Sequence, residues 1–206
     1  MEIENNSINQ VAQTSKTNVV SPYGETKEEI DYSEYTISEI RDIPYAEAKE
    51  NYDQIMERAT NLEKQGVDEE SFIATMQLEK INYSDNNKLN EVLYETMRLT
   101  DDPKDAMFLD YEIMVNLQDY YYGKDITASF VISDSNDSGH AHKELNRTQL
   151  SNINVDDFIT KMLEAFTNDY NNTKGGAIKE QYKNIVDGYN LLKDSYDKAI
   201  TEPSYA

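Results

Sequence analysis

A heptad pattern near the C-terminus constrains the fold more than any other feature of this chain. Between residues 177 and 200, apolar or tyrosine side chains recur at alternating steps of four and three. Such spacing places these side chains on one face of an amphipathic helix, as a narrow seam that another surface must cover. The seam consists of Ile178, Tyr182, Ile185, Tyr189, Leu192, Tyr196 and Ala199. The seam could be buried in two ways, by the rest of this chain or by a second molecule.

The stretch directly before the seam predicts a helix that could cover it. Asn154 has the side chain of a helix N-cap, and residues 155–172 carry an apolar face of their own. That face consists of Phe158, Met162, Phe166 and Tyr170. Gly175 and Gly176 then separate the two predicted helices, which is typical of a helical hairpin, here over residues 151–202.

A second molecule is the other cover that the pattern allows. Three of the seven seam positions are tyrosines, whose rings pack well while their hydroxyls tolerate water. The chain would then form a homo-oligomer, or bind a helix of a protein partner in a groove. The partner-binding residues would be Tyr182, Ile185, Tyr189, Leu192 and Tyr196.

Helical patterns also fill residues 41–123. Capping and helix-breaking residues mark their starts and ends, at Pro44, Gly66, Asp68, Asp102, Pro103 and Gly123. Together with the C-terminal hairpin, these patterns predict a mainly α protein, a bundle of about six helices. We expect it to form a single mainly helical domain over residues 41–202.

Two short stretches show the alternation of a β-strand instead. In DITASFVIS, the side chains of Ile126, Ala128, Phe130 and Ile132 fall on one side, which predicts a strand near residues 126–133. A lone strand needs a mate, and EYTISEI (34–40) is the internal candidate, with a second molecule as the alternative. The polar run that follows predicts a surface loop, so residues 124–150 read as a strand and a loop.

The N-terminal residues 1–40 lack a helical period and are rich in Asn, Ser, Thr, Gln and Glu. This composition buries too little apolar surface to offset the entropy of ordering, which predicts a disordered, flexible polar tail. The first residues also lack the basic and apolar regions of a secretory signal. We therefore expect the protein to be cytoplasmic, or exported by a route other than Sec.

The net charge of the chain restricts the classes of molecule that it can bind. Its 206 residues include 40 acidic and 19 basic ones, for a net charge of −21. Because phosphate backbones and anionic lipids are bound through Lys and Arg, the charge predicts no nucleic-acid partner. No stretch is apolar enough for membrane insertion. The chain has no Cys, which excludes disulfides, thiolate catalysis and Cys-ligated metal sites.

The stretch 134–144 resembles part of a calcium-binding EF-hand loop. Its oxygen-bearing residues occupy the first, third and fifth loop positions, and a glycine follows where such a loop turns sharply. The twelfth position is Leu145, where a bidentate Glu is expected. The two histidines of the chain would point the same way on an extended segment. The candidate metal ligands are Asp134, Asn136, Ser138, His140 and His142, and a plain solvated turn is the alternative.

No motif for nucleophilic catalysis or for phosphate binding occurs in the chain. Carboxylate pairs such as Glu69–Glu70 and Asp156–Asp157 lie where helices are predicted to begin, and there they offset the helix dipole. The preferred function is therefore a non-catalytic protein-interaction, scaffold or assembly protein that uses Tyr-rich helical faces. An acidic-residue or metal-dependent hydrolase is a further alternative.

The polar N-terminus MEIENNSINQVAQTSKTNVV, the absence of Cys and the C-terminal heptads resemble flagellar and related type III export substrates and their partners. The resemblance covers less than a third of the chain. It differs from the filament proteins, because no N-terminal heptads are present to pair with the C-terminal helix. The resemblance implies a secreted or surface-delivered accessory protein whose N-terminal tail is an export address.

Overall fold

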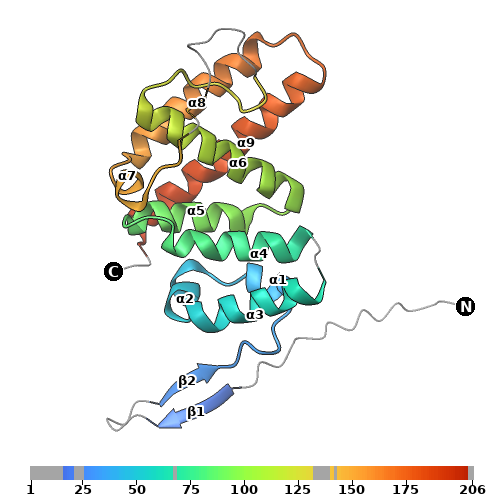
Figure 1. Ribbon diagram of the computed structural model, residues 1–206, viewed down its shortest axis with the longest axis vertical. Coiled ribbons are helices and arrows are strands. Elements are labelled where there is room, and N and C mark those ends of the chain that lie inside the picture. The colour runs from blue at the N-terminus through green and yellow to red at the C-terminus, as the bar shows by residue number, and fades with distance from the viewer. Residues whose placement is uncertain (1–15, 21–25, 67–68, 132–139, 142, 204–206) are drawn as a thin grey trace, which may run out of the picture. The chain divides into compact units, whose positions relative to one another are not determined.

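The computed structural model describes residues 16–20, 26–66, 69–131, 140–141 and 143–203 (Figure 1). The chain divides into two compact units, residues 1–35 and 36–206. In the first unit, strand β1 (Lys16–Val20) pairs antiparallel with β2 (Thr26–Ile30), and Lys16 lies opposite Ile30. Half of the predicted flexible tail 1–40, namely residues 1–15 and 21–25, lies outside the described residues. The described half contains both strands and the first residues of a helix that begins at Ile37, so the predicted tail without structure is too long.

The second unit is mainly α-helical, as the sequence predicts. Six of its helices in the described residues are seven residues or longer. The helices are α1 (Ile37–Arg41), α2 (Tyr45–Glu50), α3 (Tyr52–Gln65), α4 (Glu69–Glu79), α5 (Asn87–Leu99), α6 (Pro103–Tyr122), α7 (Arg147–Ser151), α8 (Val155–Asn172) and α9 (Ala177–Thr201). A single 3₁₀ turn, η1 (Lys80–Asn82), extends α4 in the described part of the chain.

Three predicted capping residues, Asp102, Gly123 and Asn154, act where the sequence places them. The Asp102 carboxylate accepts the backbone N–H groups of Lys104 and Asp105, which fixes the start of α6. Gly123 ends the same helix with a φ of 65°, a left-handed conformation that favours glycine. The Asn154 side chain accepts the N–H of Asp157 at the start of α8.

The weak strand prediction for EYTISEI is wrong, because its last residues begin helix α1. Thr36 and Glu39 form a capping box, in which each side chain accepts the backbone N–H of the other residue. Arg41, at the end of α1, donates to the carbonyl of Thr100 at 2.6 Å and so satisfies the C-terminal end of α5. The helical unit therefore begins before residue 41.

The prediction of a strand near 126–133 is also wrong for residues 126–131, which form no strand; residues 132 and 133 lie outside the described part. A turn closes here instead, with the Val131 N–H donating to the Ala128 carbonyl at 2.9 Å. Ile126, Ala128 and Phe130 pack inward against the helices, which accounts for their alternation. A carboxylate on α6, and no second strand, satisfies the backbone N–H of Ser129.

The polar run that the sequence predicts as a surface loop contains helix α7. Asn146 and Gln149 cap this helix reciprocally. The Arg147 guanidinium reaches across to η1 and donates to the Asn82 carbonyl at 2.6 Å and to Asp85 at 3.0 Å. These contacts attach α7 to the start of α5.

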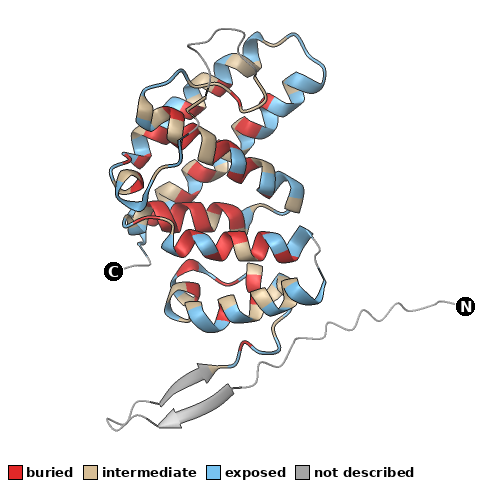
Figure 2. Ribbon diagram, in the orientation of Figure 1, coloured by how far each residue is buried: buried red, intermediate tan, exposed pale blue. Residues whose placement is uncertain are grey.

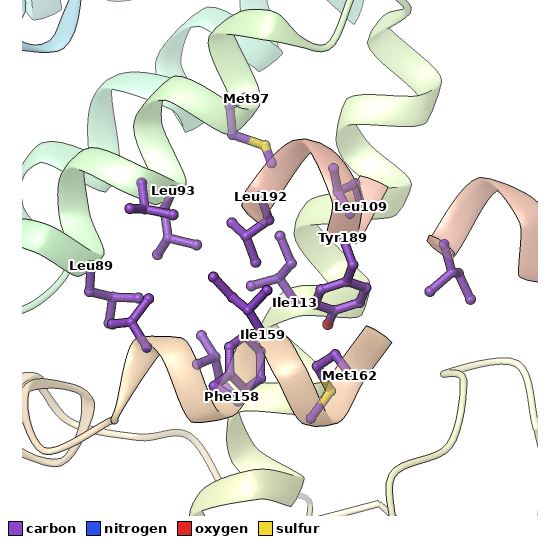
Figure 3. Packing of buried hydrophobic residues seen from close by; sticks show 14 of the residues in the cluster. Leu89, Leu93, Met97, Leu109, Ile113, Phe158, Ile159, Met162, Tyr189 and Leu192 are labelled. Carbon is purple, nitrogen blue, oxygen red and sulfur yellow. The ribbon is translucent and has the colours of Figure 1, made fainter. Parts of the chain in front are cut away.

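The C-terminal hairpin contributes much of the core. Helices α8 and α9 pack along each other, α5 packs against α9, and the buried residues lie on facing helix surfaces (Figure 2). In Figure 3, side chains from α5, α6, α8 and α9 point into one cluster. The Tyr189 ring stacks on Phe166 at 5.5 Å and meets the edge of Phe158 at 6.1 Å. The heptad seam is thus covered by this chain's own helices.

Candidate functional site

The seam cannot serve as a free binding surface, which corrects the sequence-based assignment of partner-binding residues. Tyr182, Ile185, Tyr189 and Leu192 are all buried by helices of the same chain. Ile178, at the start of the seam, is 55% exposed. Tyr196 is half-buried, so of the proposed residues it alone keeps access to solvent.

Tyr196 lines a shallow polar groove of about 560 Å³ where α5 and α8 begin. Asn86, Lys88 and Asn154 also line this groove. The Lys88 ammonium lies 5.6 Å from the centre of the Tyr196 ring, so the only nearby cation of the lining is held against an aromatic face. The groove therefore has a mainly polar lining, to which Asp85 adds a carboxylate and Ile153 and Val155 add apolar groups.

Exposed apolar side chains gather instead at the start of α6. Met107 and Tyr111 lie one turn apart on α6, 41% and 58% exposed, and Phe72 on α4 is 44% exposed. The ion pair between Lys104 and Glu69 joins the first turns of the two helices, and Phe72 and Met107 each lie three residues beyond it. We name Phe72, Met107 and Tyr111 the α6 face.

A groove of about 200 Å³ opens between the start of α6 and the middle of α9. Its floor is formed by Phe108, Leu109, Gly188 and Leu191. Gly188 is essential to this shape, because a Cβ atom there would lie 2.5 Å from Leu109 Cδ1, well inside van der Waals contact. The glycine thus lets α9 approach α6 closely and leaves a shallow apolar trough beside the contact.

The rim of this groove is polar and acidic. It is formed by Thr100, Asp105, Asn184 and Asp187. Asp105 and Asp187 are both exposed. Lys183 pairs with Asp187 at 3.1 Å, and the pKa of this lysine is raised chiefly by its hydrogen bond to that carboxylate. We name these eight residues the α6–α9 groove.

A row of buried polar side chains follows the groove along α6. Glu112, Asn116 and Asp119 are fully buried at steps of four and three. The Glu112 carboxylate accepts the Ser129 backbone N–H at 3.0 Å, the Ser129 hydroxyl, and Asn116 Nδ2 at 3.3 Å. Burial raises the pKa of Glu112, while the Ser129 hydrogen bonds oppose that rise.

Asp119 makes the second set of contacts in this row. It accepts the Ala141 N–H at 2.6 Å, and its other oxygen lies 2.6 Å from His140 Nδ1. Glu112 and Asp119 together fasten two non-helical segments to α6. Titratable groups of this kind can carry acid–base chemistry. Here they are enclosed, and neither groove described above is lined by Glu112, Asp119 or His140.

The proposed metal ligands divide between described and undescribed residues. Asp134, Asn136, Ser138 and His142 lie outside the described residues, so the calcium site remains a prediction. His140 is described, and its Nδ1 faces Asp119 instead of solvent. Within the described part of the chain, no group of three or more His, Cys, Asp or Glu side chains is arranged to hold a metal ion.

The residues of the α6 face and the α6–α9 groove were missed by sequence reasoning. Leu109 is the exception in the groove, because helical period places it with Ile113 on the inward stripe of α6, and both are buried. Met107, Phe108 and Tyr111 lie off that stripe, and these extra apolar residues were the available signal. Gly188 in the middle of a long helix was a second one.

No protein-family model, curated protein or solved structure matches this chain. The resemblance to flagellar and type III export proteins therefore remains a prediction from sequence. None of the described helices is long and apolar enough to cross a membrane.

Proposed function

We propose that this protein is a non-catalytic interaction or scaffold protein that binds a protein partner over the α6 face. The observation that carries this proposal is the joint exposure of Phe72, Met107 and Tyr111 on two neighbouring helices. Single exposed apolar side chains are common on protein surfaces, whereas adjacent ones indicate an interaction site.

Two further features support a binding role on this side of the unit. The α6 face adjoins the α6–α9 groove, since Phe108 of the groove directly follows Met107 in α6. Met and Tyr are also enriched at protein interfaces, because Met adapts its shape and Tyr combines an apolar ring with a polar tip. In contrast, the second groove, around Tyr196, has a mainly polar lining.

A pair of variants tests this proposal. Met107→Glu with Tyr111→Glu places two charges on the α6 face, and Ile178→Glu with Ile200→Glu adds the same charge at exposed apolar positions on α9. Each tagged full-length variant is purified from the native cell, and its co-purifying proteins are quantified by mass spectrometry. We expect a protein that accompanies the wild type and the α9 variant and is lost from the α6 variant.

Circular dichroism shows whether both variants keep their helical content. The proposal is overturned if the α6 variant retains every protein that the wild type captures, or if wild type and variants capture none.

A further inference from the structure

We propose that the α6–α9 groove binds a basic segment of the partner protein, anchored by one large apolar side chain. This inference rests on the proposed function and names the chemistry of the partner. It depends on three observations: the volume of the groove, a ring from a non-helical segment that this chain packs against α9, and the charge of the groove rim.

The volume of the groove suits a side chain better than a small-molecule ligand. At about 200 Å³ it is smaller than the roughly 300–1,000 Å³ of pockets that enclose drug-sized ligands. Its floor is apolar, with Phe108 and Leu191 half-buried and therefore still reachable. A single aromatic or leucine side chain would cover these carbons and remove them from water.

The chain itself packs a ring from a non-helical segment against α9. The Phe130 ring, on a non-helical segment, packs against Tyr182 of α9 with 5.2 Å between ring centres. The adjoining Ser129 N–H donates to Glu112, which lies one turn beyond Phe108 on α6. A partner segment in the α6–α9 groove would likewise place one apolar side chain against these two helices, beside Phe108.

The negative charge of the groove rim favours a basic segment as the ligand. Asp105 and Asp187 lie on the α6 and α9 sides of the groove, and Asp101 and Asp102 precede α6 at the same end. Lys or Arg residues on either side of the anchor would meet Asp101, Asp102 and Asp105. At Asp187 they would compete with Lys183, which pairs with that carboxylate. A second copy of this chain is a poorer occupant, because it brings the same net charge of −21 and is repelled.

A peptide selection tests the inference without assuming a partner sequence. The full chain is immobilised and a random phage-displayed peptide library is selected on it. We expect the enriched peptides to share one aromatic or leucine residue flanked by Lys or Arg. A synthetic peptide of the enriched sequence is then titrated by fluorescence anisotropy against the wild type and two variants.

The variants separate groove binding from general attraction to an acidic protein. Asn184→Trp fills the groove from its rim, and Asn190→Trp adds the same side chain at an exposed position on α9 that does not line the groove. Both keep the net charge. We expect Asn184→Trp to weaken peptide binding at least tenfold and Asn190→Trp to leave it within twofold of the wild type.

The inference is overturned by enriched peptides that show no basic preference, by equal binding to both Trp variants, or by a selection that enriches nothing. None of these results bears on binding over the α6 face, because the proposed function is tested separately by the variant with Met107→Glu and Tyr111→Glu. Conversely, loss of the α6 face would not alter peptide capture in the α6–α9 groove, so the two failures are distinguishable.

Discussion

Glu112 allows the sharpest test of the packing described here, because one carboxylate holds the turn at residues 128–131 against α6. Replacing Glu112 with Ala removes the acceptor of the Ser129 backbone N–H and hydroxyl. A buried donor left without a partner costs about 1–3 kcal/mol, and the small cavity adds about 1 kcal/mol. We expect Glu112→Ala to lower the free energy of unfolding by about 2–4 kcal/mol.

Glu112→Gln should behave differently. Its amide oxygen can still accept from Ser129. Asn116 Nδ2 donates to Glu112 in the wild type, so the Asn116 amide must turn over to let its Oδ1, which accepts no hydrogen bond in the described part of the chain, accept from the new N–H₂ group. The pKa of Glu112 is raised by burial above its ordinary value of 4.5, so the folded state binds this proton more tightly than the unfolded state does. The contribution of Glu112 to stability is therefore full below pH 4.5 and declines as pH rises through the folded-state pKa.

Urea unfolding followed by circular dichroism between pH 4 and pH 8 measures both effects. We expect the wild type to lose stability relative to Glu112→Gln as pH rises, as measured by the difference between their unfolding free energies. The shared titration of the other groups cancels in that difference. If the difference does not change with pH, or if it shifts in favour of the wild type, the pKa of Glu112 is not raised in the folded state and this reasoning is refuted. A Glu112→Ala cost below about 0.5 kcal/mol would refute its role in holding the turn.

Three further changes test the packing and the helix start. Tyr189→Ala should lower the unfolding free energy by about 3–5 kcal/mol, whereas Ile178→Ala should change it by less than about 0.5 kcal/mol, as measured by urea unfolding. Gly188→Ala should destabilise the wild type by about 1 kcal/mol through its overlap with Leu109. In a Leu109→Ala background the same change should stabilise by about 0.5–1 kcal/mol, and equal effects in both backgrounds would contradict the close helix approach. Thr36→Ala should cost about 1 kcal/mol in thermal unfolding, and Thr36→Ser should restore most of it.

The long helices could be predicted from sequence because their signals are local. The caps at Asp102 and Asn154 act within three residues of themselves, so their chemistry is visible in a short window. The seam from Tyr182 to Ala199 likewise follows from helical period alone. The sequence alone allows either this chain or a second molecule to bury the seam. The packing of α5 and α8 on α9 shows that this chain does so.

The segment 126–131 shows where local pattern fails. Its apolar alternation arises from packing on α6 and α9, and its backbone is satisfied by Glu112, 17 residues away. No local window contains that partner, so the period of two was interpreted as a strand. On α6, Glu112, Asn116 and Asp119 repeat with helical period beside the apolar stripe, a pattern that ordinarily indicates a solvent-exposed face. Their burial follows from the segments that pack over them, and so could not be predicted from the sequence.

The α6–α9 groove depends on an approach between two helices that are far apart in sequence. Leu109 and Gly188 meet only because both helices pack into the same core, and nothing near either residue predicts the other. The sequence shows that side chains such as Met107 are apolar, but it does not show whether they are buried or exposed. Whether they face the core or solvent is settled by which neighbouring helices cover α6.

Site-specific photocrosslinking tests the binding surface most directly. A photoreactive amino acid replaces Met107 in the full chain, and in a separate variant it replaces Ile178, which is also exposed and apolar. Both variants are irradiated in the native cell, and crosslinked products are resolved by gel and identified by mass spectrometry. Binding over the α6 face predicts a discrete adduct with one protein from position 107 and none from position 178. No adduct from position 107, or the same adducts from both positions, would contradict it.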